Sequence, residues 1–242
     1  MPKRSRKRSY GVRNKKKKIF GAMTSASTRL VPLRYGNISS YSQLTKGLLG
    51  KRFRTKLIYM ERGRTVNPGA GGLAATHVFT ANGLWDPDVT GVGHQPTGFD
   101  QFMSFYDHYT VVSAKIYVHF KNFDNTLDQM VGIYVSDRAS TESDYRNIIE
   151  NGLGTYSIVG NVNDTNNAME LAQAVSISSF LGRPNILDED NLQGTAGTNP
   201  ADQAYFHVWA APTIAADSGS VEINTRIEYI VEFKEPKILP TS

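Results

Sequence analysis

Five histidines are the side chains best suited to acid–base or metal chemistry, and their spacing favours neither. His77, His94, His108, His119 and His207 form no HExxH or HxxxH pattern, and the chain has no cysteine to complete a Cys/His site. His119 and His207 fall inside predicted strands, where a core or surface histidine is the expected role. No G-x-S-x-G motif surrounds a serine. We therefore expect no catalytic residue, no metal site, no cofactor and no enzymatic activity.

Three other polar patterns are better explained as loops than as ligand sites. The GAGG stretch at 69–72 lacks the Gly-Lys-Ser/Thr that completes a phosphate-binding loop. NVNDTNN (161–167) and LDEDN (187–191) offer oxygen ligands for calcium between subunits, but surface turns use the same residues and neither has EF-hand spacing. Calcium binding by these two loops therefore stays an open alternative. Asp86 and Asp88 flank Pro87 and predict a turn.

The strongest chemical signal is the charge of the N-terminal quarter. Residues 1–60 contain 17 Lys or Arg and no acidic residue, whereas residues 61–242 contain the other 10 basic residues and all 22 acidic ones. Such asymmetry indicates a polyanionic partner for the N-terminal part alone, and nucleic acid is the commonest. The sequence contains no run of eighteen apolar residues, so it predicts no membrane-spanning helix. The predicted phosphate-binding residues of this segment are Lys3, Arg4, Arg6, Lys7, Arg8, Arg13, Lys15, Lys16, Lys17 and Lys18.

The two basic clusters also have the layout of a bipartite nuclear-import signal. They are separated by SYGVRN, and a host import receptor would be the partner. The two roles use the same charges and do not exclude each other. The import signal would comprise Lys3, Arg4, Arg6, Lys7, Arg8, Lys15, Lys16, Lys17 and Lys18.

The organisation of the chain follows the same division. Residues 1–47 are predicted to be a basic, largely disordered arm and linker, because they are self-repelling or weakly patterned. Residues 48–242 read as a single domain with about eight strands, at 51–65, 75–85, 109–123, 128–136, 155–160, 170–177, 203–212 and 221–233. Short helices are predicted at 97–109, 140–150 and 176–183. Many strands, uneven loops and no long helix favour an all-β, eight-stranded, two-sheet jelly roll.

Two predicted strands raise the question of a basic sheet surface. Arg52, Arg54 and Lys56 alternate with apolar residues, and Lys115, His119 and Lys121 do so in a second strand. If both strands share a sheet, its polar face could add to nucleic-acid binding. The last predicted strand argues against a simple version, because its polar positions include Glu222, Glu228 and Glu232. A solvated strand face is the alternative.

The segment HQPTGFDQFMSFYDHYTVVSAKIYVHFKNF (94–123) resembles capsid proteins of circular Rep-encoding single-stranded DNA viruses, the circovirus-like group. The similarity consists of a Pro-x-Gly-Phe-Asp-Gln element, a Tyr-x-x-Tyr/His pair and a long strand rich in Val, Lys and Ile. The matching residues are Pro96, Gly98, Phe99, Asp100, Gln101, Tyr106, Tyr109 and the stretch 111–120.

This resemblance implies a structural coat protein found in the virion and, during assembly, in the host nucleus. It implies an icosahedral shell, T=1 with sixty identical copies, whose inward-facing arms package single-stranded DNA. Phe99, Phe102 and Tyr106 would lie at a subunit interface, although burial within their own subunit is equally expected. The alternatives are the coat of a small single-stranded RNA virus, a non-viral nucleic-acid-binding β-domain and a jelly-roll lectin.

Overall fold

The computed structural model describes residues 49–239 except 70, 153 and 215–217. The predicted basic arm and its boundary with the body lie outside these residues. The described chain runs, in order, through the following elements: β1 (Arg52–Val66), β2 (Ala75–Thr80), α2 (Phe99–Phe105), β3 (Tyr106–Asn122), β4 (Gln129–Ser136), α3 (Tyr145–Glu150), β5 (Gly154–Val159), β6 (Ala168–Ser176), α4 (Ile177–Leu181), the 3₁₀ turn η1 (Asp190–Leu192), β7 (Tyr205–Pro212) and β8 (Val221–Pro236).

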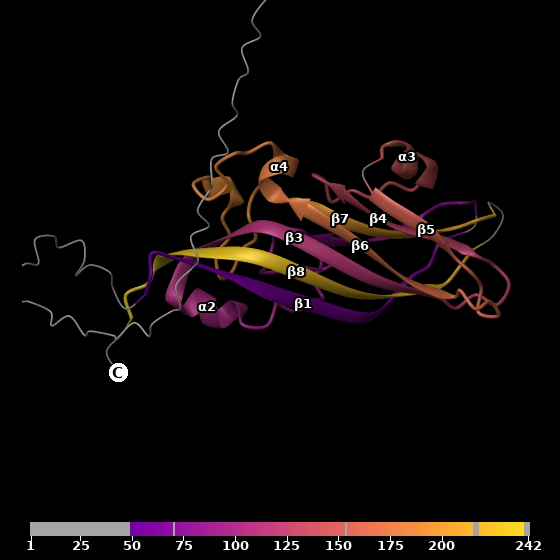
Figure 1. Ribbon diagram of the computed structural model, residues 1–242, viewed down its shortest axis with the longest axis horizontal. Helices are drawn as coiled ribbons and strands as arrows, with labels where there is room; N and C mark the ends of the chain where they lie inside the picture. Colours follow the sequence, from indigo (N-terminus) through magenta and orange to yellow (C-terminus); the bar gives the residue numbers. More distant parts are fainter. Residues whose placement is uncertain (1–48, 70, 153, 215–217, 240–242) are drawn as a thin grey trace, which may run out of the picture. The chain divides into compact units, whose positions relative to one another are not determined.

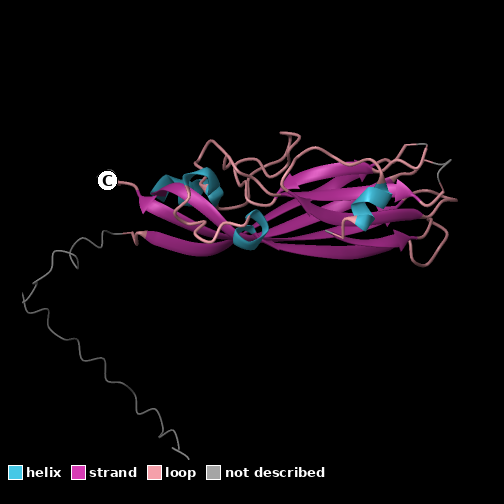
Figure 2. Ribbon diagram, turned by 90° about the horizontal axis from the view of Figure 1, so that it is seen from above, coloured by secondary structure: helices cyan, strands magenta, loops and turns pink. Residues whose placement is uncertain are grey.

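The strands form two four-stranded antiparallel sheets packed face to face (Figures 1 and 2). The first sheet has the order β1-β8-β3-β6 and the second has the order β2-β7-β4-β5. The chain therefore crosses repeatedly between the sheets, and strands far apart in sequence become neighbours. This strand order is that of a jelly roll, so the predicted fold class is confirmed.

The first sheet follows the alternation predicted from its sequence. In β8, Val221, Ile223, Ile227, Tyr229 and Val231 are buried between the sheets together with Thr225, and the polar residues that alternate with them point outward. Strand β3 behaves in the same way after a bulge near Val111, because the extra residue of a bulge resets which side chains face the core. One face of this sheet therefore packs on the core and the other faces outward.

The second sheet is more deeply buried. Strands β4 and β7 read as continuous apolar runs, and nearly all their residues are buried. Their outward side chains are covered because α3 packs over them, and Ile148 of α3 belongs to one small buried cluster with Tyr134, Trp209 and Ala211. Trp209 lies over Gly132, where an added Cβ would meet the indole ring at 2.6 Å. A strand buried on both faces loses the polar–apolar alternation.

The segment that resembled viral capsid proteins has a local structural role. Gly98 takes a positive φ of 90° at the start of α2, a conformation that favours glycine, and Phe99 then packs edge-on against Tyr109 with ring centroids 5.3 Å apart. The helix is shorter than the sequence predicted. Tyr106 already has extended backbone angles and begins β3, because Tyr106–Tyr109 pair with β8 and Gly194 instead of continuing the helix.

The chain enters and leaves the first sheet at the same end. Arg52 at the start of β1 lies opposite Lys234 near the end of β8, and the Tyr106 hydroxyl donates to the Gly50 carbonyl at 3.1 Å. The loops at the other end are joined to one another. Phe123 donates its N–H to the Ser220 carbonyl at 2.9 Å, and Val162 donates to Asp124 at 2.8 Å.

Candidate nucleic-acid interface

The predicted interface residues fall into two groups. The ten basic residues between Lys3 and Lys18 lie outside the described part of the chain, so their role stays a prediction. Arg52, Arg54 and Lys56 are described, and their exposed side chains lie on the outer face of the first sheet.

These three basic side chains are engaged by carboxylates within the body. The buried Glu232 carboxylate accepts from Arg54 Nε at 3.0 Å and Nη2 at 2.7 Å, and from Arg52 Nη1 at 3.4 Å. Lys56 Nζ lies 3.6 Å from a Glu228 oxygen. Since β8 lies between β1 and β3, its glutamates neutralise the basic stripe that the sequence of β1 presents.

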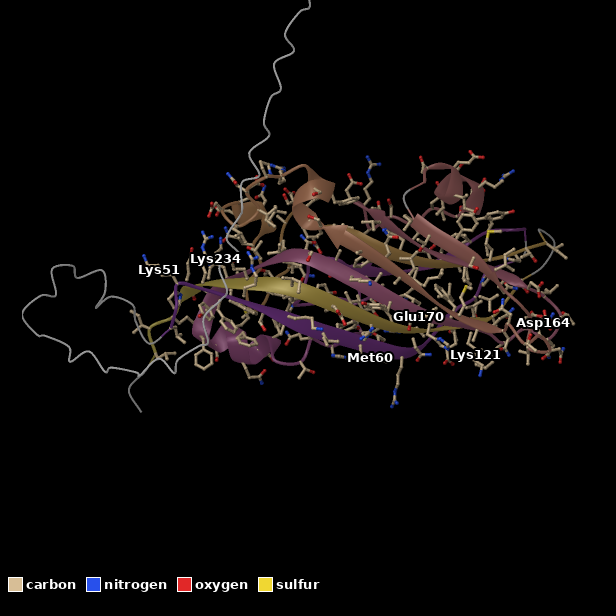
Figure 3. All side chains as sticks on the ribbon, in the orientation of Figure 1. Lys51, Met60, Lys121, Asp164, Glu170 and Lys234 are labelled. Atoms are coloured by element: carbon tan, nitrogen blue, oxygen red, sulfur yellow. The ribbon has the colours of Figure 1, made fainter. Side chains whose placement is uncertain are left out.

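The rest of this outer face is mixed in charge. Lys115 and Lys121 of β3 lie directly opposite Glu228 and Glu222 of β8. The Tyr117 ring makes cation–π contacts with two basic side chains. Lys115 Nζ lies 4.5 Å and Arg226 Cζ lies 4.2 Å from the ring centroid. Figure 3 shows Lys121 near the end of the sheet, away from Lys51 and Lys234. The continuous basic sheet surface that the sequence left open is therefore absent from the described residues.

The predicted interface aromatics pack largely inside their own body. Phe99 and Tyr106 are 0% and 4% exposed and belong to the main core. Phe102 is partly buried, and its ring stacks between Phe53 and Phe233 with centroids 5.3 and 5.0 Å away. Burial within the subunit, the alternative that the sequence left open, describes Phe99 and Tyr106, and only Phe102 retains a partly exposed surface.

The side chains of the two loops considered as calcium sites make ion pairs and hydrogen bonds within the body. Asp188 pairs with Arg52 at 2.9 Å, and Glu189 lies 3.4 Å from Arg183. In the 161–167 loop, Asn161 donates from its N–H to Asp128 at 3.0 Å. Among the described residues, no group of three His, Asp or Glu side chains is placed to hold a metal ion.

A cluster of ionisable side chains, which the sequence did not predict, lies at the border between the sheets. Arg64 donates from Nε to Glu61 at 2.7 Å and from Nη2 to the fully buried Asp88 at 2.6 Å. His77 Nε2 lies 3.0 Å from the other Asp88 oxygen, and the Tyr59 hydroxyl bonds to Glu61. Burial lowers the pKa of His77 despite the attraction of the Asp88 carboxylate. Asp88 is therefore more than a turn residue, because it fixes the loop after β2 to β1.

The geometry of β1 explains how this cluster forms. The strand has a bulge between Glu61 and Arg64, where Gly63 adopts a positive φ of 72°. The extra residue brings Glu61 and Arg64 within reach of each other although they are three positions apart. In the sequence, Gly63 between Glu61 and Arg64 is a signal for such a bulge. The sequence gives no signal for Asp88, the other partner of Arg64, because it lies in the loop after β2.

His94 is held by two acceptors. Its Nδ1 lies 2.7 Å from the Gln95 carbonyl oxygen and its Nε2 lies 2.8 Å from the Met60 carbonyl oxygen. Because carbonyl oxygens only accept, both contacts are hydrogen bonds only when the ring carries two protons. The two backbone carbonyls, Gln95 foremost, accordingly raise the pKa of His94. The ring also lies 4.8 Å from that of Tyr59, so it joins the 94–97 loop to β1.

The other histidines have structural positions. His207 is buried, with its Nε2 2.8 Å from the Arg138 carbonyl oxygen and its ring stacked 4.4 Å from that of Tyr134. Burial lowers the pKa of His207. His119 is exposed on β3, and His108 Nδ1 lies 2.7 Å from Glu235. No helix in the described ranges is long and apolar enough to cross a membrane.

Comparison with known proteins gives distant structural likenesses. No protein-family model and no curated protein matches the sequence. Among solved structures, that of Cocksfoot mottle virus is 14% identical over 77% of this chain and 96% of its own, with a TM-score of 0.47. The decameric BFDV capsid protein is 12% identical over 75% and 99%, with a TM-score of 0.41. Turnip yellow mosaic virus is 12% identical over 78% and 97%, also at 0.41. With TM-scores below 0.5, the fold assignment rests on the strand order itself.

Proposed function

We propose that this chain is a structural viral capsid protein whose β body self-associates into a closed shell and whose N-terminal segment holds the genome. The observation that carries the proposal is that one chain combines a jelly-roll body with a strongly basic N-terminal segment. A jelly-roll body, a fold used by viral shells, follows residues 1–47, which carry 13 basic and no acidic side chains. The fold alone would also suit a lectin, which leaves the basic stretch without a role.

The ion pairs of the body support this division of labour. Arg52, Arg54 and Lys56 have carboxylate partners, and residues 61–242 carry a balance of −12. A nucleic acid approaching the body meets mixed charge, whereas residues 1–18 offer ten cations without a single carboxylate. Each phosphate neutralised by such a cation releases counterions, which makes the binding strong, insensitive to sequence and sensitive to salt.

The finer assignment rests on the resemblance of residues 94–123 to the circovirus-like group. It comprises an icosahedral shell of sixty copies, a single-stranded DNA genome, and import into the host nucleus through the same basic clusters. Sixty copies would bring roughly 600 cationic side chains from residues 1–18 to the genome. The coat of a small single-stranded RNA virus is the alternative in which only the nucleic acid differs.

The first experiment tests assembly and packaging together. The full chain is purified, mixed with single-stranded DNA or RNA of equal length, and inspected by negative-stain microscopy and analytical ultracentrifugation. Uniform closed particles with protected nucleic acid support the proposal, and preferential protection of DNA supports the finer assignment. Only monomers or small complexes under all conditions would contradict it.

A matched pair of variants separates charge from sequence. In one variant the ten basic residues between Lys3 and Lys18 are replaced by Gln, and in the other the order of residues 2–18 is scrambled. The Gln variant should form shells that leave nucleic acid open to nuclease, and the scrambled variant should package normally because counterion release needs charge alone. Equal packaging by both would show that the segment does not hold the genome.

A further inference from the structure

The four edge strands of the body are not equally protected. An edge strand presents unpaired backbone N–H and C=O groups, which pair with another chain unless charges or covering segments prevent it. The edge of β2 is covered by its own loop, since Thr80 donates its N–H to Pro87 at 2.8 Å and Val89 donates to Val78 at 3.3 Å. On β6 the exposed positions carry Glu170 and small side chains. Strands β1 and β5 remain.

The middle of β1 lies at a sheet edge and carries two exposed apolar side chains, Ile58 and Met60, between the charged Lys56 and Arg62. The Met60 carbonyl accepts from the loop residue His94, so it points away from β8. Because backbone groups alternate along an antiparallel strand, those of Ile58 and Lys56 point the same way. Ile58 and Met60 are 41% and 51% exposed. Figure 3 shows Met60 on β1 at the margin of the body. A groove beside this edge is lined by Lys56, Leu57, Ile58, Met60, His94 and Thr97.

Strand β5 has the same character at the other side of the body. It pairs only with β4, and its sequence from Gly154 to Val159 carries no charge. Tyr156 and Ile158 are 52% and 49% exposed, at the same two-residue spacing as Ile58 and Met60. Strands β1 and β2 contact each other at one side of the sandwich, and β5 and β6 contact each other at the opposite side.

We propose that β1 of one copy pairs edge to edge with β5 of the next copy, which brings the two apolar pairs into contact across the junction. This inference rests on the proposed function, since it names the surface through which the body self-associates. A second copy is the occupant that fits, because the chain itself carries both halves of the contact. Cross-strand apolar pairs stabilise such a junction, and a head-to-tail contact between different surfaces repeats from copy to copy and closes into a ring where its rotation allows.

Charge reversal across the junction provides one test. Ile58→Glu and Ile158→Lys each place a charge at an exposed position, so both variants should stay folded by circular dichroism. Each variant alone should form only small species, because its new charge would face an apolar side chain of the next copy. Sedimentation velocity measures the size of these species. The double variant should regain particles, because each glutamate then meets a lysine of the next copy. The matched control, Ile58→Lys with Ile158→Lys, should not regain them. Normal assembly of both single variants would overturn the inference.

Cross-linking gives a second test, because the chain contains no cysteine. Cysteine pairs are introduced at Ile58 or Met60 together with Tyr156 or Ile158, four combinations that cover alternative registers. Oxidised particles of at least one combination should give a ladder of covalent oligomers without reductant, and a control pair at Ile58 and Ile214 should not. Particles that form in all four combinations without a ladder would overturn the inference and leave the proposed function standing. Absence of particles from the unmodified chain would instead remove the proposed function.

Discussion

The two sheets of this body share one core but differ on their outer faces. The first sheet carries charged residues there, arranged as cations of β1 and β3 on either side of the glutamates of β8. The second sheet carries aromatic and aliphatic residues, which α3 covers around Trp209. The difference shows that a shared fold leaves the outer faces free to differ, one toward water and one toward a second layer of packing.

The charge that the basic residues of the body present depends on the neighbouring strand. In sequence, Arg52, Arg54 and Lys56 form an unbroken basic stripe on one face of a strand. In the sheet, the neighbouring strand supplies Glu228 and Glu232 to the same surface. A basic strand therefore does not make a basic sheet, and the charge available to a polyanion depends on which strands are neighbours.

The largest effect is expected on the outer face of the second sheet. Trp209→Ala should lower the free energy of unfolding by about 3–5 kcal/mol, because the ring is buried under α3 and its loss leaves a cavity. Trp209→Phe is the matched control. Its cost should be smaller, since the indole N–H has no hydrogen-bond partner among the described residues. Urea unfolding followed by circular dichroism measures both. A cost below about 1 kcal/mol for the alanine variant would show that α3 does not pack there.

A smaller effect is expected from the ion pairs of the first sheet. Glu232→Gln should cost about 1–2 kcal/mol, because the carboxylate is buried while the two arginines that it binds are half exposed and screened by solvent. Added salt should reduce the difference from the unmodified chain. With residues 2–18 deleted, the same variant should bind single-stranded DNA more tightly, since Arg52 and Arg54 lose their partner. Glu222→Gln, whose carboxylate accepts from the Asn224 amide, is the control and should change stability by less than about 0.5 kcal/mol.

The smallest effect is a pH dependence at the margin of β1. The folded-state pKa of His94 is raised, so its contribution to stability is complete below the ordinary histidine pKa of about 6.5 and is lost as pH rises through the raised value. His94→Gln should therefore cost more at pH 5.5 than at pH 8. The buried His77 and His207 have lowered pKa values and destabilise the fold on acidification. Because His77 and His207 are present in both the unmodified chain and the His94→Gln variant, their effect cancels in the stability difference between the two. A difference independent of pH would show that His94 does not carry the second proton.

Local pattern was sufficient to predict most of the fold. Strands of the first sheet were recognised because Ile223, Ile227 and Tyr229 alternate with polar residues, and the frequency of strands indicated a jelly roll. The short apolar runs of β4 and β7 predict strands, but no pattern reveals that α3 covers them. The short α2 was predicted too long, since the pairing of Tyr106 with Pro236 is a long-range event.

The features that stayed hidden all depend on contacts distant in sequence. The pairing of Arg54 with Glu232 requires the register between β1 and β8, across 178 positions of the chain. The burial of Asp88 requires Arg64 to arrive from the bulge of another strand. A single sequence shows which residues carry charge, whereas the partners are set by topology and register.

The entry and exit of the chain at one end of the first sheet has a practical consequence for engineering. Arg52 and Lys234 lie opposite each other there, while the loops around Asp124, Val162 and Ser220 gather at the far end. A foreign epitope grafted into those far loops is separated by the length of the sandwich from β1, the strand that follows the N-terminal segment proposed to hold the genome. If the shell assembles as proposed, such grafts give a display particle whose cargo chemistry and antigen presentation are tuned independently.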